Sequence, residues 1–312
     1  MRRIATISPV FGCSVEDLRA LAREAEDAGF EAIYSPEVQP WSAIANAQVF
    51  AEATSNIKVG TWIANIYMRH PVVAAGGALT VQEVSGGRMV LGLGVSHKPI
   101  NDKFGVNMGN LIEEMRKYVT TIRSFIDGSS ELLRLKRDLP PVPIYIAGLT
   151  QKTCELAGEV SDGIMAYIAT PSYVKKMVEA VKTGAEKAGR FANEIDITNG
   201  LPTFISEDTE SAYDAAKKGL GMYATFPFYQ RMIKNVGYPE IIEKIKDGVN
   251  PAEALTNEFL DEVALIGPPS RCREKLDAFI DAGLRLPIIV PNPVGKQSNV
   301  EVMKNVTGTF KE

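Results

Sequence analysis

Polar side chains follow several apolar, strand-like segments of this chain, at the points where those segments end. Glu37, Asn65 and the pair Ser96–His97 follow the second, third and fourth of these segments. The later segments are followed by Gly148 and Thr150, by Tyr167, by Asn199 and Thr203, and by Asn292. Imidazole titrates near neutrality and a partly buried carboxyl group can be raised toward it, so Glu37 and His97 are the candidate proton donors or acceptors. A polar turn is the simpler explanation of any single position, but their joint placement indicates one shared site.

The segment IAGLTQKT (residues 146–153) offers a second kind of chemistry. Gly148 follows a strand-like run and Thr150 stands at the mouth of a helix, so backbone N–H groups and a hydroxyl could cradle a phosphate. The alternative is an ordinary turn in which Thr150 only caps the helix. His70, directly before Pro71, is predicted to cap its own helix in this way. The segment LGLGVSH lacks the third glycine of a dinucleotide-binding loop, which disfavours a Rossmann site.

Eight strand-like runs alternate with helical segments along the chain. They span residues 3–10, 31–37, 57–66, 89–96, 142–149, 163–169, 194–206 and 286–293. Strands separated by helices pair in parallel, so eight such units predict a (β/α)8 TIM barrel, with a doubly wound open sheet as the alternative. No linker divides the chain, and residues 1–312 are therefore predicted to form a single domain. Residues 222–262 lengthen the connection between strands seven and eight and predict a helical insertion over one end of the barrel.

The composition limits the class of protein. The chain has 312 residues, a formal net charge of -4 and a pI of about 5.5, so no basic field suggests nucleic acid. No apolar run reaches the ~18 residues of a membrane-spanning helix, and no long apolar signal region opens the chain. Cys13, Cys154 and Cys272 lie far apart and predict a reducing compartment, with neither a disulfide framework nor a zinc site. We expect a cytoplasmic protein that acts on a small molecule, without a metal and without nucleic-acid or membrane partners.

Four segments together resemble the bacterial luciferase-like superfamily, and within it the coenzyme F420-dependent oxidoreductases of the methylene-tetrahydromethanopterin reductase type. They are VGTWIANIYMRHP, GGRMVLGLGVSH, PIYIAGLTQKTCELAGEVSDGIM and ALIGPPSRCREKLDAFIDAGLRLPIIV. The resemblance covers nearly the whole chain and is weakest over residues 222–262. It implies a homodimeric F420-dependent enzyme that moves a hydride between the deazaflavin C5 and a small organic substrate. An FMN-dependent monooxygenase of the same superfamily and a non-catalytic flavin- or deazaflavin-binding protein are the alternatives.

The resemblance also implies which residues hold the cofactor. The third strand is expected to bulge within Thr61–Ala64, with a cis peptide bond between Trp62 and Ile63 that supports the deazaflavin ring. The phosphate is expected at the turn Gly148–Leu149–Thr150, and the acidic tail near Lys98, Lys152, Lys175 and Lys176. The full set of expected cofactor-binding residues is Thr61, Trp62, Ile63, Ala64, Asn65, Gly94, Ser96, Ala147, Gly148, Leu149, Thr150 and Ala166.

One departure from the family pattern affects the expected reaction. Related F420-dependent sugar-phosphate and alcohol dehydrogenases carry an Asp-His pair after the second strand, in a context such as SDHFQPW. This chain reads SPEVQPW, with Pro36 and Glu37 in place of that pair. This departure from the pattern therefore favours a reductase that acts on a C=C, C=N or carbonyl group over an alcohol dehydrogenase.

Overall fold

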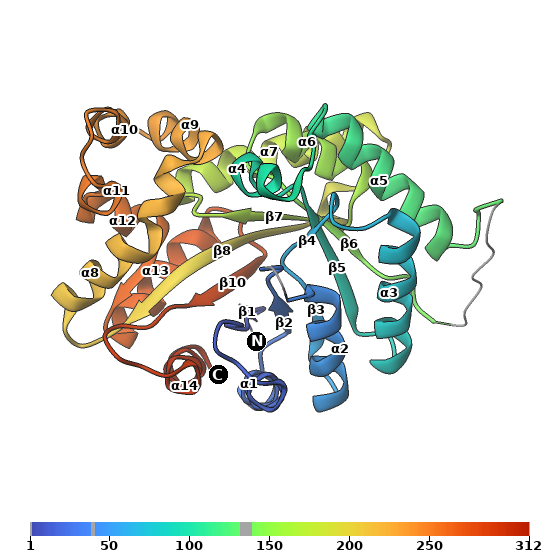
Figure 1. The fold of residues 1–312 in the computed structure, drawn as a ribbon, viewed down its shortest axis with the longest axis horizontal. Coiled ribbons are helices and arrows are strands. Elements are labelled where there is room, and N and C mark those ends of the chain that lie inside the picture. Colours follow the sequence, from blue (N-terminus) through green and yellow to red (C-terminus); the bar gives the residue numbers. More distant parts are fainter. Residues whose placement is uncertain (1, 39–40, 132–138, 312) are drawn as a thin grey trace.

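A computed structural model of the chain describes residues 2–38, 41–131 and 139–311. Eight parallel strands, of which the third is in two pieces, form one closed barrel (Figure 1). They are β1 (Ala5–Ile7), β2 (Ala32–Ser35), β3 (Lys58–Thr61) with its continuation β4 (Ala64–Asn65), β5 (Met89–Gly94), β6 (Ile144–Ala147), β7 (Gly163–Tyr167), β8 (Asp196–Ile205) and β10 (Leu286–Pro291). The last strand, β10, pairs with β8 on one side and with β1 on the other, which closes the ring. The predicted TIM barrel is confirmed, and the doubly wound alternative is wrong.

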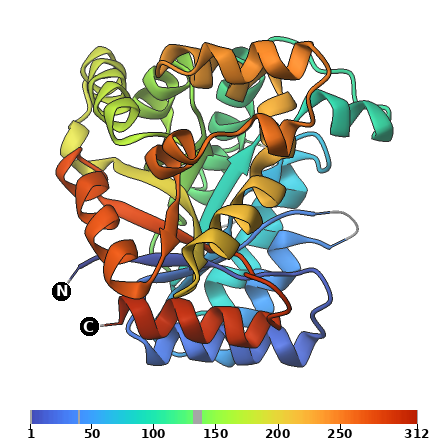
Figure 2. The same cartoon turned by 90° about the vertical axis from the view of Figure 1, so that its left-hand side faces the viewer.

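Helices surround the barrel in chain order (Figure 1). The outer layer contains α1 (Val15–Asp27), α2 (Ala43–Ala53), α3 (Pro71–Val84), α5 (Leu111–Ile126), α6 (Gln151–Val160), α7 (Pro171–Lys187), α13 (Pro269–Asp281) and α14 (Asn299–Phe310). The short helices α4 (Lys98–Asn101), η1 (Asp102–Phe104) and η2 (Ala192–Glu194) lie in the loops. The C-terminal α14 lies beside α1, where the Thr307 hydroxyl donates to Glu24 (Figures 1 and 2). Within the described ranges, no helix has the length and apolar character needed to cross a membrane.

A helical segment connects β8 to the last barrel strand. It contains α8 (Thr209–Leu220), η3 (Gly221–Thr225), α9 (Pro227–Asn235), α10 (Pro239–Lys246), α11 (Pro251–Ala254), α12 (Asn257–Val263) and the strand β9 (Leu265–Gly267). These helices bury an apolar cluster of their own, which includes Phe226, Ile241 and Phe259. The sequence analysis did not predict β9, a three-residue strand that pairs with the end of β8 outside the closed ring.

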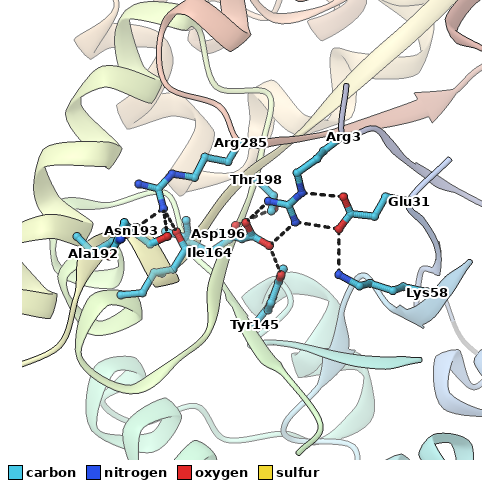
Figure 3. A network of polar contacts seen from close by, with 11 residues as sticks. Arg3, Glu31, Lys58, Tyr145, Ile164, Ala192, Asn193, Asp196, Thr198 and Arg285 are labelled. Atoms are coloured by element: carbon cyan, nitrogen blue, oxygen red, sulfur yellow. Dashed lines mark hydrogen bonds and ion pairs between the residues drawn. The ribbon is translucent and has the colours of Figure 1, made fainter. Parts of the chain in front are cut away.

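A network of charged side chains ties together the N-terminal ends of four barrel strands (Figure 3). The Arg3 guanidinium donates to Glu31 at 2.7 Å and to Asp196 at 2.9 Å, and Lys58 donates to Glu31 at 2.9 Å. The Tyr145 hydroxyl also donates to Asp196. Burial acts to raise the pKa of Asp196, but the hydrogen bonds from Arg3 and Tyr145 outweigh burial, and the pKa falls below its usual range. Ion pairs therefore fix this end of the barrel. The cavity lined by the predicted site residues lies at the opposite end.

Candidate active site

A cavity of about 300 Å³ lies at the C-terminal ends of the barrel strands. This is the end of a β/α barrel at which loops bring chemical groups together. Ten of the residues predicted from the sequence line it: Glu37, Trp62, Ile63, Ser96, His97, Ala147, Gly148, Leu149, Thr150 and Ala166. The structure thus brings most of the predicted site into one place, and the role of these residues in binding a cofactor stays a prediction.

Four predicted cofactor-binding residues do not line this cavity: Thr61, Ala64, Asn65 and Gly94. They lie one layer behind its wall. The buried Thr61 hydroxyl donates to the carbonyl oxygen of Gly92 at 2.6 Å, and the Asn65 side chain donates to Asn101 at 2.9 Å. A Cβ atom on Gly94 would come within 2.5 Å of the Ile63 side chain, so a glycine is needed there for Ile63 to fit. These residues contact the residues that line the cavity, and their role in binding a cofactor stays a prediction.

The third barrel strand is interrupted where the sequence analysis placed a bulge. Regular pairing stops at Thr61 and resumes at Ala64, and the peptide bond between Trp62 and Ile63 is cis, as predicted. The Trp62 ring lies edge-on to Tyr167, with ring centroids 5.1 Å apart. Gly200 makes room for both rings, because a Cβ atom there would lie 2.5 Å from the Trp62 ring and 2.8 Å from that of Tyr167. The buried Trp62 Nε1–H has no hydrogen-bond partner among the described residues, although Trp62 itself lines the cavity.

His97 is placed so that a ligand could reach its imidazole. Its ring stacks on Phe226, with centroids 4.2 Å apart and planes 15° apart. The buried Nδ1 atom has no partner in the described part of the chain. Burial lowers the pKa of His97 below its usual value, so the ring is neutral at pH 7 and carries one N–H donor and one acceptor nitrogen. A neutral histidine with one free nitrogen can hold or accept a proton at the cavity wall.

Replacing His97 with glutamine is expected to flatten the acid side of the stability profile. The unfolded chain protonates its histidine near pH 6.5, whereas the folded protein resists protonation because the His97 pKa is lowered. The wild type should therefore lose stability as the pH falls below about 6.5, while above that pH this group adds no pH dependence. Urea unfolding of both proteins between about pH 7.5 and 5.5 measures the effect. A stability difference that stays constant over this range would contradict the assignment.

The Glu37 carboxylate accepts hydrogen bonds from neighbouring residues. Both of its carboxylate oxygens accept hydrogen bonds from Arg69, one of them at 2.7 Å, and the backbone N–H of Asn65 donates to it at 2.6 Å. The side chains are 4% exposed for Glu37 and 15% for Arg69. Tyr118 fixes the same loop by donating to the Arg69 carbonyl oxygen at 2.9 Å. These contacts fix the carboxylate and predict that Glu37 positions the loop after β4, whereas its proton-transfer role stays an untested prediction.

Aromatic residues of the insertion form a wall that the sequence analysis did not assign to the site. Tyr223, Phe228 and Tyr229 line the cavity, and the adjacent Phe226 stacks on His97. The segment MYATFPFYQ at residues 222–230 is dense in aromatic side chains, and this density is the feature of the sequence that could have indicated an aromatic binding wall. Its position could not be inferred because it depends on how α9 packs against η3 and α10, which lie beside it (Figure 1).

A second cavity, of about 870 Å³, adjoins the first and shares Leu149, Thr150 and Phe228 with it. Lys175 and Lys176 on α7 and Arg231 on α9 line this second cavity, against a single carboxylate from Glu179. Within the described ranges none of the three cations forms an ion pair. Of the other predicted lysines, Lys98 pairs with Asp102 at 2.7 Å and Lys152 lines neither cavity.

The turn before α6 is built differently from the predicted phosphate cradle. Thr150 is the helix N-cap, which confirms the alternative weighed from the sequence, and His70 caps α3 as predicted. The N–H groups of Leu149 and Thr150 donate to the Thr153 hydroxyl at 3.1 and 3.0 Å. The N–H of Gly148 donates to the Met165 carbonyl oxygen at 3.1 Å.

The expectation that these three N–H groups are free is therefore wrong, because the side chain of Thr153 and the neighbouring strand already accept from them. The N–H groups that lack an acceptor among the described residues belong to Gln151 and Lys152, in the first turn of α6. Gln151 lines the second cavity. An anion drawn to this helix N-terminus would therefore meet the first turn from the side of the second cavity.

Comparisons with known proteins give consistent results. The family model described as luciferase-like monooxygenase matches residues 6–286. A 5,10-methylenetetrahydromethanopterin reductase of Methanolobus tindarius is 25% identical over 304 residues, which cover 88% of this chain and 89% of the reductase. The solved structure of the coenzyme F420-dependent tetrahydromethanopterin reductase of Methanopyrus kandleri matches with a TM-score of 0.80 at 21% identity, covering 99% of this chain and 100% of that one. An F420-dependent secondary alcohol dehydrogenase, solved with an F420–acetone adduct, matches with a TM-score of 0.78 at 17% identity over 100% of both chains. Monooxygenases, one of them solved with FMN, share the fold.

Proposed function

The chain belongs to the luciferase-like monooxygenase family, and from this premise we propose that it is an oxidoreductase that uses coenzyme F420 to exchange a hydride with a small organic substrate. Relatives that cover most of the chain are named as reductases and as an F420-dependent oxidoreductase. The solved structures with a similar fold include F420-dependent enzymes. These names support the proposal, and the two cavities give it an independent physical basis.

The observation that carries the proposal is the contact between two chemically different cavities. The first is lined mostly by aromatic and apolar side chains, and none of its described lining residues is a lysine or arginine. The second contains Lys175, Lys176 and Arg231 and receives the N-terminus of α6. A flat, uncharged ring in the first cavity and an acidic tail in the second match a deazaflavin that carries a phosphate and several carboxylates. The shared residues Leu149 and Thr150 lie where the two parts would join.

The residues present fit such a cofactor, and the free Trp62 Nε1–H is the clearest sign of this fit. The segment Trp62–Ile63 would support one face of the ring, with the indole N–H as donor to a ring acceptor. When bound, the deazaflavin supplies hydride chemistry at its C5 and, with carbon in place of the flavin N5, reacts poorly with oxygen. His97 would hold or move the proton that accompanies hydride transfer, at its free Nδ1 atom. The apolar lining would exclude water from the reacting atoms.

Neutralising the cations of the second cavity is expected to weaken F420 binding selectively. The variant Lys175→Ala/Lys176→Ala/Arg231→Ala should bind F420 at least about tenfold more weakly, because charge-assisted contacts are worth about 1.5–3 kcal/mol each and tenfold is about 1.4 kcal/mol. Binding of the deazaflavin that lacks the phosphate and tail should change little. Fluorescence titrations at one moderate salt concentration measure both ligands.

Lys182→Ala is the matched control, because Lys182 is an exposed lysine of α7 that lines neither cavity. Equal loss for both ligands in the triple variant, or equal loss in the control, would place the tail elsewhere. Titration with FMN and measurement of oxygen uptake test the rival function. Tighter binding of FMN together with substrate-dependent oxygen uptake would replace F420 chemistry by a monooxygenase reaction. Binding of F420 without hydride transfer across a substrate panel would favour a carrier.

A further inference from the structure

The aromatic wall contributed by the insertion indicates what kind of substrate the first cavity takes. We propose that Tyr223 and the rings around it bind an uncharged, flat, conjugated molecule whose carbonyl or imine heteroatom accepts a hydrogen bond from the Tyr223 hydroxyl. This inference rests on the proposed function, since it identifies the substrate class for the same site. Tyr223 would be a specificity-determining residue supplied by the insertion.

The ring geometry is the first argument. The Tyr223 ring lies edge-on to three others, with centroid distances of 5.0 Å to Tyr167, 5.3 Å to Tyr229 and 6.1 Å to Phe226. Through Tyr167 these rings contact Trp62, and through Phe226 they contact His97. The cavity is thus bounded by aromatic side chains from β7, from the β3–β4 break and from the insertion. Stacking and edge contacts with such rings favour flat π-systems.

The hydroxyl groups are the second argument. The hydroxyls of Tyr167 and Tyr223 interact with each other. Burial raises the pKa of both groups, and their interaction raises the pKa of Tyr167 further but acts against burial at Tyr223. Both residues line the first cavity, and within this pair one hydroxyl can donate and the other accept. Each phenol has one proton, so one O–H proton of this pair remains for another acceptor, and Tyr223 is the member of the pair that belongs to the insertion. A ligand heteroatom in the cavity would satisfy it.

The charge distribution is the third argument. Among the described residues, the ionisable side chains at the wall of the first cavity, tyrosines aside, are Glu37, which pairs with Arg69, and His97, whose pKa burial lowers. A buried ion without a partner is costly, so a charged group on the substrate would find no counter-ion there. The cations of the second cavity lie beyond Phe228 and serve the cofactor tail in the proposed function. Substrates without charge are therefore preferred.

Coumarin is a suitable probe, because it is flat, uncharged and conjugated and has a carbonyl acceptor. The chain contains two tryptophans, so Trp41→Phe leaves Trp62 at the cavity wall as the sole indole fluorophore. In this background, coumarin should quench Trp62 emission saturably, and coumarin-3-carboxylate should bind at least about tenfold more weakly. Adding Tyr223→Phe should weaken coumarin binding about fivefold to tenfold, the effect expected for one lost hydrogen bond. Tyr238→Phe, in the same insertion but outside both cavities, should leave it unchanged.

The outcomes separate this inference from the proposed function. F420 titrations of the same variants report on the cofactor site, and coumarin binding is measured without cofactor. Equal affinity for coumarin and its carboxylate, or no effect of Tyr223→Phe, would overturn the substrate class even if F420 binds normally. Displacement of coumarin by F420 would also overturn it, because the wall would then hold the cofactor ring. Failure to bind F420 with coumarin selectivity intact would overturn only the proposed function.

Discussion

Replacing Gly184 with alanine is expected to lower the free energy of unfolding by about 3 kcal/mol, the upper end of the usual cost of overpacking. Gly184 lies in the last turn of α7, where this helix packs closely against α6. A Cβ atom there would lie 1.9 Å from the carbonyl oxygen of Glu155, and one on Gly158 of α6 would lie 2.2 Å from that of Val181. The obstructing atoms belong to the backbone, so no side-chain rotation relieves the clash. The two helices would have to move apart.

Urea unfolding of Gly184→Ala and the wild type measures this cost directly. Gly308→Ala is the matched control, because Gly308 also lies in a helix but a Cβ atom there would meet nothing within 4 Å. This control should be neutral or stabilising by up to about 1 kcal/mol, since alanine is the better helix former. The first turn of α6 and the lysines of α7 both border the second cavity, so Gly184→Ala should also weaken F420 binding. A stability of Gly184→Ala within about 0.5 kcal/mol of the wild type would show that the helices tolerate separation.

The barrel could be predicted because its parallel strands are buried on both faces and read as continuous apolar runs. The run MVLGLG, for example, is buried at every position of β5. β9 was missed because three apolar residues after a helix carry no periodicity that separates strand from helix. The cis bond at Trp62–Ile63 was predicted from the family resemblance, and nothing in the local residue types alone required it.

The parts of the site that were not predicted depend on contacts between distant segments. Glu37 and Arg69 are 32 residues apart in sequence, and nothing in either segment indicated that they pair. The aromatic wall depends on where a helical insertion folds back over the barrel. The capping role of Thr153 was accessible, because a threonine three residues after Thr150 fits a capping box. Because Thr153 accepts from the N–H groups of Leu149 and Thr150, this pattern predicts anion contacts at the first turn of α6 and not at Gly148–Thr150.

The second large effect on stability is expected at the buried ion pair between Glu37 and Arg69. Glu37→Gln and Arg69→Met should each lower the free energy of unfolding by about 3 kcal/mol, because removing one partner leaves the other charge buried without compensation. The double variant should lose much less than the sum, since it leaves no uncompensated charge. Lys98→Ala serves as a control on an exposed pair with Asp102, for which a cost below about 1 kcal/mol is expected.

The same variants decide between positioning and proton transfer at Glu37. If the carboxylate holds the loop after β4, Glu37→Gln should weaken cofactor binding as it lowers stability, and the double variant should recover part of both. If Glu37 transfers a proton, Glu37→Gln should bind cofactor and keep its stability but lose turnover, and Arg69→Met should rescue nothing. Both carboxylate oxygens accept from Arg69, and one also accepts from the Asn65 N–H, so the positioning result is the expected one. His97 is then the remaining predicted proton donor or acceptor, and its Nδ1 atom has no partner among the described residues.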